Sequence, residues 1–249
     1  MKKTLGQLLF YVLGTTMLFY SLQGGAHAVA DKGYVGEVSA GGITSYTLAN
    51  GFKIILIPFP SASNVRVELL VKTGSKLEGY GETGMAHLLE HMLFKGAGNR
   101  KNIKDDLTAM GASWNGTTTA DRTNYFETLS SDPNKVDAVI QLEADRFIRA
   151  KFTKADLDSE MTVVRNELEN SERNPSRLVF DALGRNSFVW HGYSRSTIGA
   201  RTDIENTSYE ALRAFHRKHY RPDNAALIVS GNFFLPTCVD ACHQTICSR

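Results

Sequence analysis

The sequence is short of cysteine, of net charge and of long apolar runs. It has 3 cysteines in 249 residues, and all of them, Cys238, Cys242 and Cys247, fall near the C-terminus. A disulfide framework would spread cysteines through the chain, so a stapled scaffold is excluded. Lys and Arg number 28 against 26 Asp and Glu, a net charge of +2. Because no basic excess exists, binding to nucleic acid or to an anionic membrane is disfavoured.

The N-terminus has the order of residues that export signals have. Lys2 and Lys3 precede a mostly apolar run over residues 8–22, and Ala26-His27-Ala28 follows. A basic start, a short apolar stretch and a small-x-small site are typical of a secretory signal peptide. The run is short and interrupted for a membrane span, and an uncleaved anchor is the alternative. We expect a signal peptide at residues 1–28, a mature chain without net formal charge, and a periplasmic location in a bacterium.

Strand signals begin soon after this segment. Asn50-Gly51 is a strong hairpin turn signal, so residues 45–59 are expected to form two paired strands. Apolar and polar residues alternate over 65–71, which predicts a strand with one buried face. Further strands are expected at residues 112–119, 123–131 and 225–231.

Capping signals predict the helices between these strands. Thr83 is expected to cap a helix that ends near Gly96, and another short helix ends at Gly111. Asp132-Pro133 is a helix start, and Thr153 with Asp156 forms a capping-box-like pair before a helix that reaches about residue 170. Thr207 and Glu210 start a last helix. With no repeat or linker, the pattern predicts one α+β domain over residues 29–235 and a separate tail over 236–249.

The segment "GMAHLLEHMLFKG", residues 84–96, places three polar side chains in a helix that is otherwise apolar. On a helix His87 and His91 lie one turn apart on one face, with Glu90 beside both. Two imidazoles so placed can bind one metal ion, and zinc is the usual occupant. The order His-x-x-Glu-His inverts the common zinc-peptidase pattern, and in both orders the glutamate faces the water that the metal activates. A polar helix edge with satisfied histidines is the alternative.

A catalytic zinc site needs a third protein ligand from another element. The acidic helix after Thr153 offers Glu160 and Glu167, which share a face because they are seven residues apart. Glu169 and Glu172 lie nearby, and the residues alone do not decide among these glutamates. An ordinary solvated acidic helix is the alternative.

Over residues 40–234 the sequence resembles the inverted-motif zinc metallopeptidases, the family of pitrilysin, insulin-degrading enzyme and the mitochondrial processing peptidase. That family has a zinc-binding glutamate about 76 positions beyond the second histidine, which is Glu167 here, and a supporting glutamate seven residues earlier, which is Glu160. Its substrate-side edge strand resembles "GASWNGTTTADRTNYF", with Asn115 at the position that contacts substrate backbone. The family usually has Ala where this chain has Gly116.

The resemblance implies a mostly antiparallel sheet packed against helices and a zinc endopeptidase that cleaves peptides or unfolded proteins. One zinc ion per chain would be held by His87, His91 and Glu167, with Glu90 as the catalytic acid–base and Glu160 orienting the ligands. The peptide would add as a strand beside Asn115. A non-catalytic subunit and a zinc-binding transport protein are the rival readings. The complete motif disfavours the first, and Glu90 with the edge strand disfavours the second.

Members of that family usually continue into a second, similar domain that closes over the substrate. Here the family's pattern stops after Phe234, and "LPTCVDACHQTICSR" follows instead. We therefore expect a partner domain or subunit, and the tail is consistent with a truncated or frameshifted reading frame. His243 and the three cysteines match no common zinc spacing, so a loose tail is expected there.

Overall fold

The structure is a computed structural model, and it describes residues 34–233. The predicted signal peptide and the tail at 236–249 lie outside this range. The described part is built on a sheet of seven strands. Among its neighbouring strands in the described part, β3 and β9 are parallel and the other pairs are antiparallel. In spatial order the strands are β1 (Gly36–Ala40), β2 (Ile43–Thr47), β3 (Lys53–Pro58), β9 (Ala225–Gly231), β4 (Asn64–Val71), β7 (Thr123–Ser130) and β6 (Ser113–Thr118).

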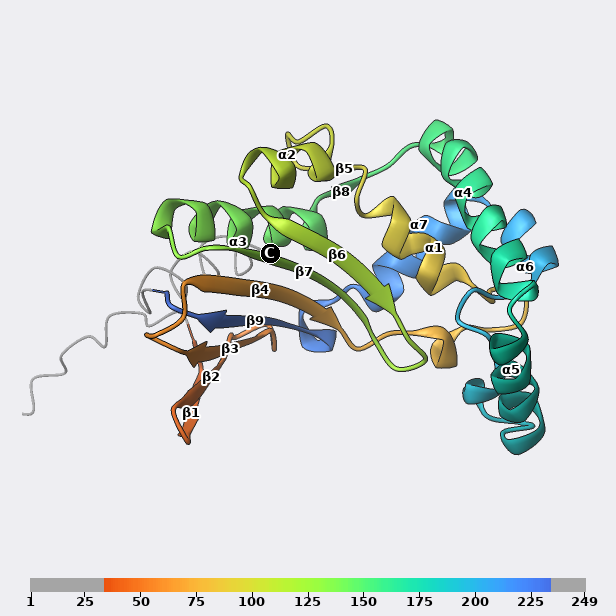
Figure 1. Ribbon diagram of the computed structural model, residues 1–249, viewed down its shortest axis with the longest axis horizontal. Coiled ribbons are helices and arrows are strands. Elements are labelled where there is room, and N and C mark those ends of the chain that lie inside the picture. The colour runs from red at the N-terminus through yellow and green to blue at the C-terminus, as the bar shows by residue number, and fades with distance from the viewer. Residues whose placement is uncertain (1–33, 234–249) are drawn as a thin grey trace, which may run out of the picture. The chain divides into compact units, whose positions relative to one another are not determined.

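Helices pack against this sheet and extend beyond its end (Figure 1). They are α1 (Met85–Met92), α2 (Ile103–Ala109), α3 (Pro133–Ile148), α4 (Lys154–Glu172), α5 (Pro175–Ser187), α6 (Arg201–Glu205) and α7 (Tyr209–His219). The 3-10 turns η1 (Ser75–Leu77), η2 (Gly192–Ser194) and η3 (Pro222–Asn224) and a small sheet of β5 (Gly96–Ala97) and β8 (Ala150–Lys151) complete the described part. The predicted α+β class with a mostly antiparallel sheet is confirmed.

The core lies between one face of the sheet and the helices. Along β4 the side chains of Val65, Val67, Leu69 and Val71 are buried, and the residues between them are partly exposed. This alternation is the one expected for a strand with one face against a core. The predicted hairpin is also present, since β2 pairs antiparallel with β3 around a turn at Gly51 whose φ is 86°.

The start of α1 differs from the predicted one. The N-cap is Gly84, in a left-handed conformation with φ 87°, and it carries no side chain to cap the helix. The carboxylate of Glu78 accepts hydrogen bonds from the N–H groups of Gly84 and Ala86 instead, each at 2.9 Å. Thr83 was expected to cap, but its hydroxyl donates to Asp203 at 2.7 Å. A carboxylate that precedes the N-cap by six residues thus satisfies N–H groups that a helix start leaves free.

Two further boundaries are corrected. Helix α1 ends at Met92, and Gly96 belongs to β5 rather than to the end of the helix. Helix α7 is capped by Ser208, whose hydroxyl accepts from the N–H of Ala211 at 3.0 Å, and not by Thr207. Adjacent Thr and Ser have similar capping propensity, so the sequence alone cannot choose between them.

Strand β1 and helices α5 and α6 were not predicted from the sequence. Helix α5 buries none of its residues fully, and Val179 and Phe180 are exposed on it. The usual sign of a surface helix is a buried apolar stripe. Its N-cap Asn174, which accepts from the N–H of Arg177 at 3.2 Å, and Pro175 after it were available signals.

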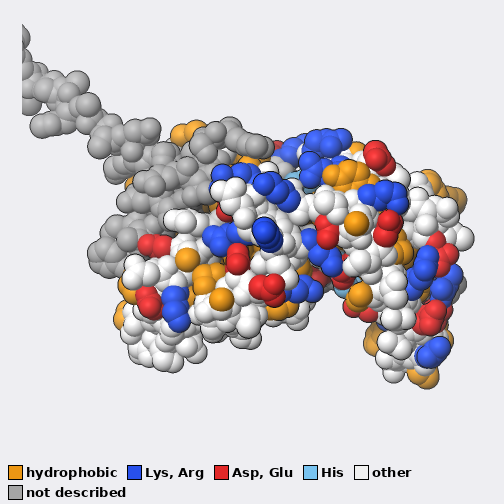
Figure 2. All heavy atoms as spheres, turned by 90° about the horizontal axis from the view of Figure 1, so that it is seen from above, with side chains coloured by type: hydrophobic (Ala, Val, Ile, Leu, Met, Phe, Trp, Pro, Cys, Tyr) orange, Lys and Arg blue, Asp and Glu red, His pale blue; other side chains and the backbone are white. Residues whose placement is uncertain are grey.

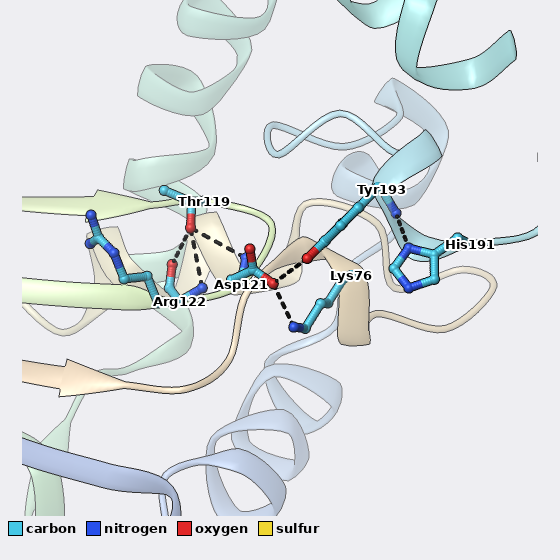
Figure 3. A network of polar contacts seen from close by, with 6 residues as sticks. All are labelled: Lys76, Thr119, Asp121, Arg122, His191 and Tyr193. Atoms are coloured by element: carbon cyan, nitrogen blue, oxygen red, sulfur yellow. Dashed lines mark hydrogen bonds and ion pairs between the residues drawn. The ribbon is translucent and has the colours of Figure 1, made fainter. Parts of the chain in front are cut away.

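A polar network joins the turn between β6 and β7 to the segment that follows α5 (Figure 3). The carboxylate of Asp121 accepts from the ammonium of Lys76 at 2.5 Å and from the hydroxyl of Tyr193 at 2.8 Å. Within the turn, the hydroxyl of Thr119 accepts from the N–H groups of Asp121 and Arg122. The turn of the edge hairpin, η1 and η2 are therefore tied together.

Within the part of the chain that the structure describes, no helix combines the length and hydropathy that crossing a membrane requires.

The capping box of α4 is complete and predicts a measurable loss of stability. Thr153 accepts from the N–H of Asp156, whose carboxylate accepts from the N–H of Thr153 at 2.8 Å. Thr153→Ala should lower the free energy of unfolding by about 0.5–2 kcal/mol, measured by urea denaturation. Ser159→Ala on the exposed middle of the same helix is the control and should cost nothing. Equal losses in the two variants would contradict this role of the cap.

Candidate metal centre

Three predicted ligands come together from two helices. His87 and His91 lie one turn apart on α1, and Glu167 reaches them from α4. Each offers one ligand atom, and all three atoms lie within 4.8 Å of one another. The two imidazole Nε2 atoms are 3.3 Å apart, and the Glu167 carboxylate oxygen is 3.5 Å from each of them.

These distances fit a tetrahedral metal. Zinc bonds to nitrogen and carboxylate oxygen of about 2.0–2.2 Å require ligand atoms about 3.3–3.6 Å apart at the corners of a tetrahedron. The three measured edges, 3.3, 3.5 and 3.5 Å, all lie in that range. The residues present therefore fit a three-ligand metal site with one open position.

Glu160 and Lys95 fix the orientation of His91. Glu160 is buried and its carboxylate is 3.0 Å from the Nδ1 of His91, while its other oxygen contacts the ammonium of Lys95. The hydrogen bond to His91, with the contact to Lys95, lowers the pKa of Glu160 to about 2 against the opposing effect of burial. An ionised Glu160 makes the His91 Nδ1–H the donor, which leaves the Nε2 lone pair directed at the metal position.

The two histidines experience different fields. Burial, together with the charges of His91 and Arg177, lowers the pKa of His87 to about 4. Burial also lowers the pKa of His91, but the hydrogen bond to Glu160 and the charge of Glu167 outweigh it, and the net shift is upward. His87 is thus neutral at pH 7, the form that binds metal. Its buried Nδ1 has no hydrogen-bond partner among the described residues.

Glu90 lies beside the metal position and is 7% exposed. Its Oε2 accepts a hydrogen bond of 2.7 Å from the hydroxyl of Thr118 on β6. Its Oε1 lies against Gly116, where a Cβ atom would come within 2.6 Å of it. A side chain at this position would therefore require Glu90 or Phe94 to move. Burial raises the pKa of the Glu90 carboxyl, and the Thr118 hydroxyl opposes that rise.

Strand β6 forms the edge of the sheet next to these groups. Trp114, Gly116 and Thr118 alternate on the face toward α1, and a cleft of about 420 Å³ lies between this strand and the metal position. The N–H of Thr119 donates to the carbonyl of Arg122 at 2.8 Å. Because hydrogen-bonded and non-hydrogen-bonded pairs alternate in an antiparallel ladder, Gly116 has its backbone groups on the open side.

Asn115 lies on this edge strand and lines the cleft. Its side-chain oxygen accepts a hydrogen bond of 2.9 Å from the N–H of Gly116. All six predicted site residues thus lie around one cleft or directly behind it. Sequence reasoning did not identify Thr118, Lys95 or Arg177. The period-two spacing of Thr118 from Gly116 and the one-turn spacing of Lys95 from His91 were available signals.

The sequence of this domain matches models of known protein families. The model of the family described as "Insulinase (Peptidase family M16)" matches residues 53–211. The chain belongs to peptidase family M16. The resemblance inferred from the motif is confirmed. A second model, "Peptidase M16 inactive domain", matches residues 206–236.

Relatives in family M16 are similar along most of the described part. An uncharacterised zinc protease of Rickettsia bellii is 31% identical over 188 residues, which cover 74% of this chain and 45% of the relative. The crystal structure of a protease from Helicobacter pylori matches with a TM-score of 0.77 at 27% identity, over 82% of this chain and 49% of that one.

The first half of the periplasmic protease PqqL from Escherichia coli has the same fold, with a TM-score of 0.75 at 22% identity. It is matched over 86% of this chain and 47% of its own length. The chain spans about half the length of the curated relatives it matches.

Loss of either histidine should remove the metal. His87→Ala or His91→Ala leaves two donors, and two donors hold a metal ion weakly. Metal analysis of the purified proteins should find about one ion per chain in the wild type and almost none in either variant. His191→Ala, which changes a histidine outside the cleft, should keep the metal. Unchanged metal content in both α1 variants would rule the site out.

The two glutamates of α4 should differ in their effect on the metal. Glu167→Gln replaces a charged ligand by a neutral amide and should abolish tight binding. Glu160→Gln should keep most of the metal and weaken affinity or activity by about 10–100-fold, as changes behind a ligand do. Competition with a chromophoric chelator measures both affinities. If Glu160→Gln lost more metal than Glu167→Gln, the two roles would be exchanged.

Proposed function

We propose that this chain is a zinc-dependent endopeptidase, or the metal-bearing half of one, and that it hydrolyses peptides or unfolded proteins in the bacterial cell envelope. The observation that carries the proposal is the triangle of His87, His91 and Glu167 with edges of 3.3–3.5 Å beside the buried carboxyl of Glu90. Zinc is the metal proposed because the M16 relative from Rickettsia bellii is named a zinc protease.

His87, His91 and Glu167 would hold the zinc, and Glu160 would keep His91 in the binding tautomer. When bound, zinc would polarise the scissile carbonyl and make a water molecule more acidic. Glu90 would take the proton from the attacking water at Oε1, while the hydroxyl of Thr118 holds Oε2 at 2.7 Å. The same carboxyl would then give the proton to the departing amine. Burial raises the pKa of the Glu90 carboxyl, which makes its carboxylate a stronger base toward that water.

The substrate would add to the sheet beside β6. This strand is at the edge, and Gly116 directs its backbone groups to the open side, so an extended peptide can continue the ladder there. Asn115 would contact the peptide backbone at this edge. Recognition through main-chain hydrogen bonds supports a broad range of peptide sequences.

A partner-dependent or non-catalytic subunit is the second candidate. It is favoured by the fact that the chain spans about half the length of its M16 relatives. A second homologous domain or subunit would close over the cleft, exclude water and stabilise charge on the carbonyl oxygen. The complete ligand set and Glu90 favour the catalytic half.

The proposed periplasmic location is supported by the signal-like residues 1–28 and by the likeness to the first half of a periplasmic protease. Nucleic acid is not a proposed partner. Lys and Arg side chains are interspersed with Asp and Glu over the described part of the face seen in Figure 2. Nucleic-acid binding proteins instead gather basic residues in a stripe.

Glu90→Gln separates metal binding from hydrolysis. The amide keeps the shape of the side chain but cannot accept the proton, so zinc content should remain. Cleavage of a quenched fluorescent peptide, assayed with a chain carrying a matching second M16 domain, should fall at least about 100-fold. Glu169→Gln, a change at a partly exposed position of α4 that does not line the cleft, is the control and should leave both unchanged. A Glu90→Gln protein that cleaves peptides at the wild-type rate would refute the proposed mechanism.

The proposal also predicts weak activity in isolation. In the proposed mechanism the second domain or subunit stabilises charge on the carbonyl oxygen. Losing one such stabilising group typically lowers turnover about 10²–10³-fold. The isolated chain should therefore be zinc-loaded and nearly inactive, and adding a chain with a matching second M16 domain should restore cleavage. Efficient hydrolysis by a monomer of this chain, established by light scattering, would contradict dependence on a second half.

A further inference from the structure

Two cations line the cleft that contains the proposed metal site. Arg177 comes from α5 and Lys104 from α2. Both line the cleft that His87 and Glu167 also line. The acidic side chains lining that cleft are Glu90 and Glu167, which belong to the metal centre. A bound divalent metal would balance those two charges, so the charge left to act on a substrate is positive.

Arg177 is held in place at the end of the cleft near His87. Its guanidinium lies 3.1 Å from the carboxylate of Asp181 one turn along α5, and it donates to the hydroxyl of Ser196 at 3.1 Å. Its side chain remains 38% exposed.

Lys104 lies at the other end, next to the start of β6. Its ammonium is 5.6 Å from the ring centroid of Phe94 and 5.7 Å from that of Trp114. Two aromatic faces hold a cation in place without neutralising it. Figure 1 shows α2 near the beginning of the β6 arrow and α5 beyond its tip.

The two ends of the cleft are only a few residues apart along a peptide that adds to β6. Trp114 and Thr118 are four residues apart on β6, about 13 Å at the strand rise. Glu90 contacts the strand at Gly116, midway between these ends, and at Thr118. A peptide lying along β6 with its scissile bond next to Glu90 would bring the side chains of about two residues on either side within reach of a cation.

We propose that this cleft selects peptides with Asp or Glu within about two residues of the scissile bond, and that Arg177 and Lys104 are the residues that recognise them. This preference rests on the proposed peptidase function and narrows its substrate class. The carboxylate would form a two-pronged contact with Arg177 or a single ion pair with Lys104. Asp181 competes with the substrate for Arg177.

The test uses the full chain, zinc-loaded, with Glu90→Gln to prevent hydrolysis. Fluorescein-labelled peptides of one sequence carry Asp and Glu, Asn and Gln, or Lys at the positions that flank the central bond. Fluorescence anisotropy gives the Kd of each at low and at physiological salt. One exposed ion pair is worth about two- to fivefold in affinity, so the acidic peptide should bind about 2–10-fold tighter than its amide counterpart. The difference should shrink as salt rises.

Variants test whether Arg177 and Lys104 cause the preference for acidic peptides. Arg177→Gln and Lys104→Gln should each remove part of the preference, and the double variant all of it. Arg185→Gln, an exposed change on the same helix, is the matched control and should keep it. Asp181→Asn frees Arg177 and should increase the preference for the acidic peptide. If the Arg177–Asp181 pair were merely structural, Asp181→Asn and Arg177→Gln would lower that preference equally. Zinc content and thermal unfolding of every variant show that the fold is kept.

Equal binding of the three peptides would overturn the acidic preference and leave the proposed peptidase intact. A preference that survives the double variant, or that falls in Asp181→Asn as it does in Arg177→Gln, would overturn the assignment to these residues. If no peptide of any charge bound the zinc-loaded protein, the proposed function itself would fail, and this inference with it.

Discussion

The contact between α1 and α4 is the constraint on which the site depends. Glu160 joins the two helices, because its carboxylate contacts the imidazole of His91 and the ammonium of Lys95, both on the α1 side. With Glu160 buried there, Glu167 two turns later on α4 is directed at the two Nε2 atoms. A shift of α4 by one residue would turn both carboxylates away, since successive helix positions differ by about 100°. The capping box at Thr153 fixes where that helix begins.

A second contact links the proton-carrying carboxyl to the peptide-binding edge. Glu90 is held by Thr118 and rests against Gly116, and both belong to β6. The strand that would receive the substrate is therefore the strand that positions the proposed base. The network around Asp121 ties the far end of this hairpin to η1 and η2, so the edge is braced at its turn (Figure 3).

Behind the cleft lies a buried charged cluster that was not predicted from the sequence. Arg146 is fully buried, with its guanidinium carbon 4.6 Å from the Phe94 ring and 4.7 Å from the Tyr125 ring. Its nearest carboxylates are Glu143 at 3.3 Å and Glu127 at 3.4 Å, both fully buried. Burial raises the pKa of both carboxyls. A buried cation with two carboxyls is electrically balanced when one of them is protonated. The cluster supports Phe94, which forms part of the cleft wall.

The sequence by itself determined what depends on neighbouring residues. The hairpin at Asn50-Gly51, the alternation along β4, the capping box of α4 and the relation of His87, Glu90 and His91 all follow from local backbone geometry. The tertiary structure decided what depends on segments far apart in the chain. It brought Glu167 rather than Glu169 or Glu172 to the histidines and placed Thr118 against Glu90. Spacing fixes directions within one helix or strand, but the distance between two elements is set by how their buried faces pack.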